Sequence, residues 1–196
     1  MCGGEPVGEP QAVRKGCRPG LQVANMTRMC LITLLAMFWA AAGAAPDPAK
    51  NLLANPGFEA EDAGGWEKRT PDDADRTLSI AAEAARSGKK GARIINRKAT
   101  NSRWRFGADE KLQVPEGAVV RLAGWIRANL AEGSASLRLY AMRTQNDILA
   151  QCSSRPVAGT AEWTRVSVTA TVPPGTAFLM AYLEMQSATG TADYDD

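Results

Sequence analysis

The chain has 196 residues, of which 45% are hydrophobic and 22% are charged, so it has room for one medium-sized domain plus accessory sequence. Four of the 23 basic and two of the 21 acidic side chains lie in residues 1–45, which leaves the remainder formally neutral. A neutral domain without a basic block argues against nucleic acid or an anionic membrane as the main ligand. The absence of histidine excludes Ser-His-Asp and Cys-His catalysis.

The N-terminal region carries the longest apolar run of the chain, residues 29–42. Arg28 precedes this run, and Ala42, Gly43 and Ala44 supply small residues at the spacing that signal peptidase reads. Because a membrane-spanning helix needs about 20 apolar residues, the run favours a secretory signal over an anchor. We therefore expect a secreted, periplasmic or cell-envelope protein that is cleaved near Ala44. The expected parts are an extension with signal peptide (1–45), a linker (46–50) and one domain (51–196).

Cysteine usage indicates how this domain must be stabilised. Three of the four cysteines precede the expected cleavage site, and Cys152 alone lies in the domain. No disulfide can therefore form within the domain, even in an oxidising compartment. A secreted domain of this kind needs a large core, a bound metal, or both.

From residue 51 onward the sequence predicts short β-strands separated by turn residues. Alternating apolar and polar side chains mark four strands most clearly, at 119–128, 136–142, 164–172 and 178–186. Further strands are expected at 77–81, 92–96, 103–106, 111–114 and 147–151. Residues 81–86 have helical composition, but Ser87 and Gly88 stop a helix there after about two turns.

The spacing between these strands is too short for crossover helices, which predicts antiparallel sheets. Each strand has one apolar face, so two sheets must pack those faces together. We therefore expect an all-β fold, a two-sheet antiparallel sandwich, with a jelly roll as its connectivity.

Several motifs follow one another in an order that resembles a known family. The domain opens with Asn51–Glu59, reading Asn-Leu-Leu-Ala-Asn-Pro-Gly-Phe-Glu, and closes with Gly190–Asp196. Between them stand Trp66 after two glycines, Ser87-Gly88 before 91–96, Val114–Gly117 before 120–128, and Trp163–Val166 before 172–176. This order is similar to that of the family 4/9 (cellulase CenC-type) carbohydrate-binding modules, which have a galactose-binding-like jelly roll. The final strand of those modules continues past the paired aspartates, so the resemblance implies a truncated product with a further domain downstream.

The same resemblance implies a structural calcium ion that joins the two ends of the domain. Its ligands would be the Gly57 carbonyl, the Glu59 carboxylate, a backbone carbonyl of the turn that ends at Lys90, and the Asp195 carboxylate. Calcium binds six to eight oxygens and mixes carboxylates with carbonyls, and a cation would relieve the repulsion between two acids. The alternative is that Glu59 and Asp195 are solvated turn residues.

A ligand-binding face follows from strand alternation. Aromatic rings stack on the C–H faces of sugars, and polar side chains bond the hydroxyls. Alternation places polar and aromatic side chains away from the core, and if their strands share a sheet they form a face suited to a neutral glycan. These candidates are Trp125, Arg127, Arg138, Tyr140, Tyr182, Glu184 and Gln186, with Trp104 near the rim.

Structural alternatives remain open for the aromatic candidates. We expect Trp66 and Trp163 in the core, since each flanks a turn and an apolar strand. Phe106 shares the face of Trp104 and could draw that ring inward. A loop could cover Trp125, and Tyr140 and Tyr182 could serve packing as well as binding. The two arginines could be solvated face charges.

These observations predict a non-catalytic, monomeric module that binds polysaccharide or oligosaccharide, an accessory of a secreted glycoside hydrolase. Glycoside hydrolysis needs two carboxylates flanking the sugar, and Glu184 is the only acid on the proposed face. The alternative is a structural or adhesive jelly-roll domain of a bacterial cell-envelope protein.

Overall fold

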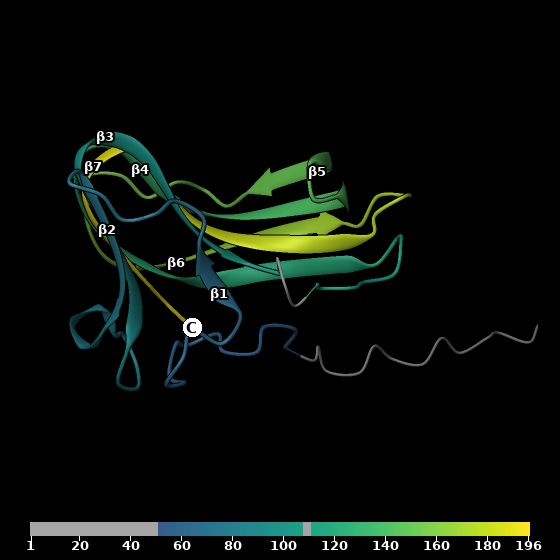
Figure 1. Ribbon diagram of the computed structural model, residues 1–196, viewed down its shortest axis with the longest axis horizontal. Helices are drawn as coiled ribbons and strands as arrows, with labels where there is room; N and C mark the ends of the chain where they lie inside the picture. The colour runs from purple at the N-terminus through teal and green to yellow at the C-terminus, as the bar shows by residue number, and fades with distance from the viewer. Residues whose placement is uncertain (1–50, 108–110) are drawn as a thin grey trace, which may run out of the picture. The chain divides into compact units, whose positions relative to one another are not determined.

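The structure, a computed structural model, describes residues 51–107 and 111–196 (Figure 1). The expected signal peptide (1–45) and linker (46–50) lie outside the described residues. In the part of the chain that is described, no helix is long and apolar enough to cross a membrane.

The described residues form seven strands and one short 3₁₀ turn, which confirms the all-β fold. The elements are β1 (Trp66–Lys68), β2 (Arg76–Ala81), η1 (Ala82–Ala84), β3 (Gly91–Phe106), β4 (Val119–Thr144), β5 (Asp147–Ser153), β6 (Thr160–Thr171) and β7 (Phe178–Asp195). All pairings between these strands are antiparallel, in the order β1-β3-β7-β4-β5, with β2 on β3 and β6 on β4. The helical composition of 81–86 yields only η1.

Three of the strands are much longer than predicted, because they pass through bends where the sequence indicates ends. The predicted strands 92–96 and 103–106 are both parts of β3, and 119–128 and 136–142 are both parts of β4. Register shifts mark the bends, and Figure 1 shows β3, β4 and β7 curving together where their labels stand. The predicted strand 111–114 is reduced to an isolated bridge between Leu112 and Leu179.

The bends divide the hydrogen-bonded sheet into two layers. The first layer holds β2, β6 and the parts of the long strands at 91–96, 119–130 and 190–195. The second layer holds β1, β5 and the parts at 102–106, 134–144 and 178–186. A Cβ built on Gly124 of the first layer would lie 3.5 Å from Leu137 Cδ1 of the second, so the layers pack face to face as a sandwich.

One apolar core fills the space between the layers. Ile126 from the first layer and Leu137 from the second are both buried in it. Tyr194, 1% exposed, crosses the core and donates a hydrogen bond of 2.8 Å to the Glu184 carbonyl. Burial, and next the negative charges of Glu184 and Asp193, raise the pKa of Tyr194 well above its usual value. Its hydroxyl therefore stays a donor at neutral pH.

The opening motif, Asn51–Glu59, folds as a turn outside the strands. The Asn55 carbonyl accepts hydrogen bonds from the Phe58 backbone and from the Trp66 indole, at 3.4 and 3.1 Å. Phe58 is 1% exposed and its ring lies 5.3 Å from that of Trp66, which in turn lies 5.3 Å from Phe106. The motif thus closes one end of the core with an aromatic cluster.

Candidate functional site

The outward face of the second layer gathers five of the predicted ligand residues. We call it the tyrosine face, and it comprises Tyr140, Tyr182, Arg138, Glu184 and Gln186. The Tyr140 and Tyr182 ring centroids are 4.7 Å apart, and these residues form with three others a hydrophobic cluster separate from the core. The other members of this cluster are Met142, Phe178 and Met180. Sequence alternation therefore placed these five side chains on a common face.

Strand register aligns charged and aromatic residues across this face. Cross-strand pairs join β1 to β3, β3 to β7, β7 to β4 and β4 to β5. They form one row of five residues: Glu67, Arg105, Tyr182, Arg138 and Ser153. Tyr182 therefore lies between two arginines, one strand away on each side.

Glu184 lies on the expected face but is fully buried there, at 0% exposure. Its carboxylate bonds Arg103 at 2.6 Å through one oxygen and Arg138 through the other. Arg138 also donates a hydrogen bond of 2.7 Å to Gln186 and a longer one of 3.5 Å to the Tyr140 hydroxyl. Glu184 is thus a positioning residue for two arginines rather than a direct ligand contact.

The arginine side chains of this face are more exposed than the tyrosine residues beside them. Tyr140 and Tyr182 are 7% and 8% exposed, whereas the side chains of Arg138, Arg105 and Arg103 are 15%, 17% and 32% exposed. Burial raises the pKa of Tyr182, with the Arg105 charge acting in the opposite direction. The tyrosine rings therefore lie beneath the arginine side chains, which form more of the accessible surface of the face.

Trp125 and Arg127 do not belong to this face, although they share strand β4 with Arg138. They precede the bend and point outward from the first layer, on the opposite side of the sandwich. Arg86 stacks on the Trp125 ring at 3.8 Å, and Arg127 bonds Asp193 at 2.7 Å. The prediction of one shared ligand face is therefore wrong for these two residues, because the bend in β4 separates them from the tyrosines.

The other tryptophans divide between core and surface. Trp104 is 3% exposed in the core beside Phe106, so its expected place near the ligand rim is wrong. Trp66 is a core residue, as predicted. Trp163 is not, because it is half-buried with the Arg127 guanidinium 4.9 Å from its ring.

Sequence reasoning missed Arg103 and Arg105, which both lie on the tyrosine face. They flank Trp104 on β3, and adjacent residues of a strand point to opposite sides. Once Trp104 is assigned to the core, alternation places both arginines outward. The alternation of side chains along β3 could therefore have identified both arginines, but only if the orientation of Trp104 had been known.

The four residues of the expected calcium site do converge at the end of the sandwich. A Cβ on Gly57 would lie 3.8 Å from Asp195 Oδ1 and 4.0 Å from Glu59 Cγ. Glu59 Oε1 accepts hydrogen bonds from the backbone N–H groups of Lys89 and Lys90, at 2.8 and 3.0 Å. Sequence positions about 140 residues apart thus meet at one loop, as the resemblance implied.

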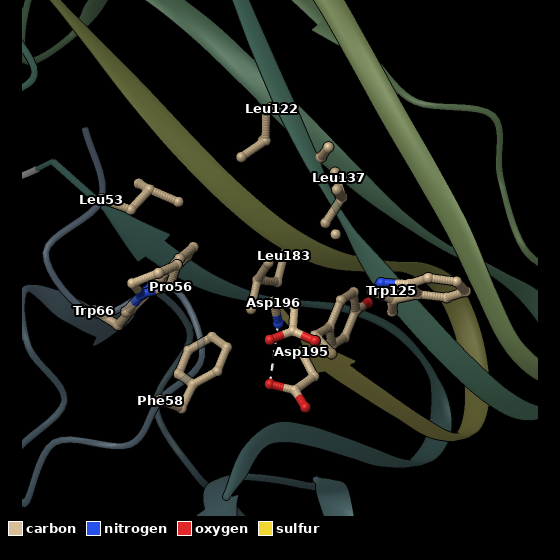
Figure 2. Close-up of a pocket in the computed structure, with 13 residues that line it drawn as sticks. Leu53, Pro56, Phe58, Trp66, Leu122, Trp125, Leu137, Leu183, Asp195 and Asp196 are labelled. Atoms are coloured by element: carbon tan, nitrogen blue, oxygen red, sulfur yellow. Dashed lines mark hydrogen bonds between the residues drawn. The ribbon is translucent and has the colours of Figure 1, made fainter. Parts of the chain in front are cut away.

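Asp195 is held by the start of the same loop. One carboxylate oxygen accepts hydrogen bonds of 2.7 and 2.8 Å from the backbone N–H groups of Arg86 and Ser87. Its other oxygen accepts a hydrogen bond of 3.0 Å from the Asp196 backbone (Figure 2). Figure 2 also shows both aspartates near Phe58. These three residues line a small cavity of about 20 Å³.

The two carboxylates of this clasp, Glu59 and Asp195, have opposite pKa shifts. Backbone hydrogen bonds from Lys89 and Lys90 lower the pKa of Glu59. Burial raises the pKa of Asp195, and the neighbouring Asp196 charge adds to that effect. Asp195 is therefore the acid whose charged state lacks sufficient compensation.

The donor set fits calcium in chemistry but is partly engaged by the protein itself. Carboxylate and carbonyl oxygens are the ligands that calcium prefers. The loop donates backbone N–H groups to the carboxylates of both Glu59 and Asp195, so each carboxylate already has protein partners. Among the described residues, no group of three or more His, Cys, Asp or Glu side chains could hold a metal ion.

Comparisons with solved structures agree with the sandwich fold. A family 16 carbohydrate-binding module is 21% identical over 74% of this chain and 96% of its own, with a TM-score of 0.54. The CBM22-2 xylan-binding domain of Paenibacillus barcinonensis Xyn10C is 15% identical over 72% of this chain and 94% of its own, with a TM-score of 0.52. The enzymatically active domain of bacteriophage CBA120 tailspike protein 4 has a TM-score of 0.60 at 11% identity, and 74% of this chain matches only 20% of that chain.

At these identities the likeness shows the fold alone. No curated protein sequence matches this chain. A family model described as a carbohydrate binding domain (CBM_4_9) matches residues 50–191, well over half of the chain. The chain therefore belongs to this family of carbohydrate-binding domains.

Proposed function

We propose that the chain binds a polysaccharide across the tyrosine face. The observation that carries this proposal is the Tyr140–Tyr182 pair, a hydrophobic cluster that faces away from the core and is bordered by polar side chains. A buried aromatic pair outside the core contributes little to holding the two layers together. It suits a floor on which sugar rings rest while guanidinium and amide groups bond the hydroxyls.

The face is built for binding rather than hydrolysis. Glycosidases need one carboxylate to protonate the leaving oxygen and a second about 5–10 Å away. Among residues 51–107 and 111–196, the two acids on this face are paired, Glu184 with two arginines and Glu67 with Arg105. Neither is free to act as a general acid, which supports a non-catalytic module.

The test compares glycan binding by variants on opposite faces of the sandwich. Binding to insoluble cellulose in a pull-down, and to soluble xylan and β-glucan in affinity gels, should be retained by Trp125→Ala and lost by Tyr182→Ala. Melting curves of both variants establish that they are folded. If Trp125→Ala abolishes binding and Tyr182→Ala leaves it intact, the ligand face is wrongly assigned.

We also propose that calcium binds at the clasp, with the Glu59 and Asp195 carboxylates as its anionic ligands. Support comes from their convergence with Gly57 and from the burial of the Asp195 carboxylate, which raises its pKa, an effect to which the neighbouring Asp196 charge adds. A bound ion would stabilise the folded chain by mass action. Millimolar calcium should raise the melting temperature of the wild type and not that of Asp195→Asn. An unchanged wild-type melting temperature contradicts the proposal.

We further propose that the module is a monomeric accessory of a secreted glycoside hydrolase, exported by the signal in residues 1–45. Family membership and the apolar run at 29–42 support this proposal. N-terminal sequencing of the exported product should begin at Ala45. The alternative, a structural or adhesive envelope domain, gains support if none of the glycans binds.

A further inference from the structure

The tyrosine face carries more positive than negative charge. Among the described residues, two carboxylates lie on it, Glu67 and Glu184, and both are already paired with arginines. Five cationic side chains lie on or beside it: Arg69, Arg103, Arg105, Arg138 and Lys111. The single Glu184 carboxylate is shared by two guanidinium groups, so the pairing leaves positive charge uncompensated.

This surplus is presented to solvent rather than buried. Arg69 and Lys111 are exposed, and the Lys111 ammonium lies 5.3 Å from the centre of the Phe178 ring at one end of the hydrophobic cluster. Arg103 exposes 32% of its side chain even though it is bonded to Glu184. A ligand approaching the rings therefore meets cations first.

The charged groups that are exposed on this face are hydrogen-bond donors. Arginine and lysine have no acceptor, and the Gln186 side-chain oxygen already accepts a hydrogen bond from Arg138. These cations therefore favour a ligand that offers them acceptors, above all charged ones.

The pairing register of β3, β7 and β4 sets the spacing of the arginine donors around the tyrosine rings. Arg105 and Arg138 occupy the strands on either side of Tyr182. Neighbouring strands lie about 4.8 Å apart, which is comparable to the width of one sugar ring. A sugar resting over Tyr182 would place a carboxylate on its ring edge within reach of a guanidinium, whose planar fork matches a carboxylate in two parallel hydrogen bonds.

We propose that the natural ligand of the tyrosine face is a uronic acid-containing polysaccharide, bound through Arg105 and its neighbouring arginines. The inference rests on the proposed glycan-binding function and narrows its substrate class from glycans in general to carboxylate-bearing ones.

The experiment compares each acidic polymer with its own neutral counterpart. Polygalacturonate and glucuronoxylan are each titrated into the chain by calorimetry beside the same polymer after chemical reduction of its carboxyl groups. At least one native polymer should bind about tenfold or more tightly than its reduced form, because a hydrogen bond between a guanidinium and a carboxylate is stronger than one between a guanidinium and a neutral hydroxyl. The Arg105→Gln variant should lose most of that preference.

Arg121→Gln is the matched control, because it removes the same charge from the outward face of the first layer. It should bind like the wild type. Equal losses in the two variants, or equally tight binding of dextran sulfate, would indicate general ion exchange and overturn the proposal. If reduced polymers or neutral glycans bind as well as acidic ones and still depend on Tyr182, the carboxylate preference fails while glycan binding stands. If no polymer binds, the proposed function itself fails.

Discussion

The buried ion cluster at Glu184 gives a sharp test of how the tyrosine face is organised. Replacing Glu184 by Gln keeps the side chain's shape but removes the charge that holds Arg103 and Arg138. Breaking a fully buried pair costs about 3–5 kcal/mol, and the partial exposure of the two arginines, 32% and 15%, reduces this to about 2–3 kcal/mol. For a domain of this size the melting temperature should fall by about 5–10 °C.

The assay is urea unfolding followed by tryptophan fluorescence, which the four tryptophans of the domain, residues 66, 104, 125 and 163, make practical. Glu162→Gln serves as the control, because this acid is exposed on β6 in the first layer and should change stability by less than about 0.5 kcal/mol. If Glu184→Gln unfolds at the same urea concentration as the wild type, the ion cluster does not stabilise the face and the argument is refuted. A stability loss with unchanged glycan affinity would instead show that the arginines hold their places without Glu184.

Three further outcomes follow from the geometry. Backbone hydrogen bonds lower the pKa of Glu59 from its usual value of 4.5. The stability that these bonds contribute is therefore present above pH 4.5 and is lost as the pH falls through the folded-state pKa. The difference in melting temperature between the wild type and Glu59→Gln should shrink over that range. Gly190→Ala should cost about 2 kcal/mol or more in urea unfolding, since its φ is 124° and a Cβ would lie 2.2 Å from a backbone carbonyl oxygen; Gly159→Ala, whose Cβ would meet no atom within 4 Å, should cost less. Asp193→Asn should cost about 1–3 kcal/mol in the same assay, because this 4% exposed carboxylate pairs with two arginines; a neutral result would mean that those arginines are held by other contacts.

Much of the fold could be predicted from the sequence because a strand pattern needs only local alternation. Residues 119–128 and 136–142 each showed one apolar face, and both faces do lie in the core. Local alternation carries no information on whether two strands are separated by a turn or joined through a bend. β4 bends at Gly133 and β7 at Gly190, where φ is 74° and 124°. The pairing between the two strands continues on both sides of the bend, interrupted only by register shifts.

The same limit decided which of the candidate residues lie together on one face, as alternation predicted. Within 136–142 and 178–186, alternation placed Arg138, Tyr140 and Tyr182 on one face without error. It could not relate that face to Trp125, because the bend between 130 and 134 turns the strand into the other layer. Trp104 failed for a different reason. Its neighbours on β3 are two arginines, and only the packing of the core shows that the tryptophan is the inward residue.

Strand β7 links the two candidate sites. Its first half supplies Tyr182 and Glu184 to the tyrosine face, and its last residues carry Asp195 to the loop at 86–90. Two acids of this central strand, Glu184 and Asp193, are buried at 0% and 3% exposure, and each is paired with two arginines. The arginine side chains are more exposed than the carboxylates that they pair with. Glu184 therefore shapes the tyrosine face through Arg103 and Arg138, whose side chains it holds beside the tyrosine rings.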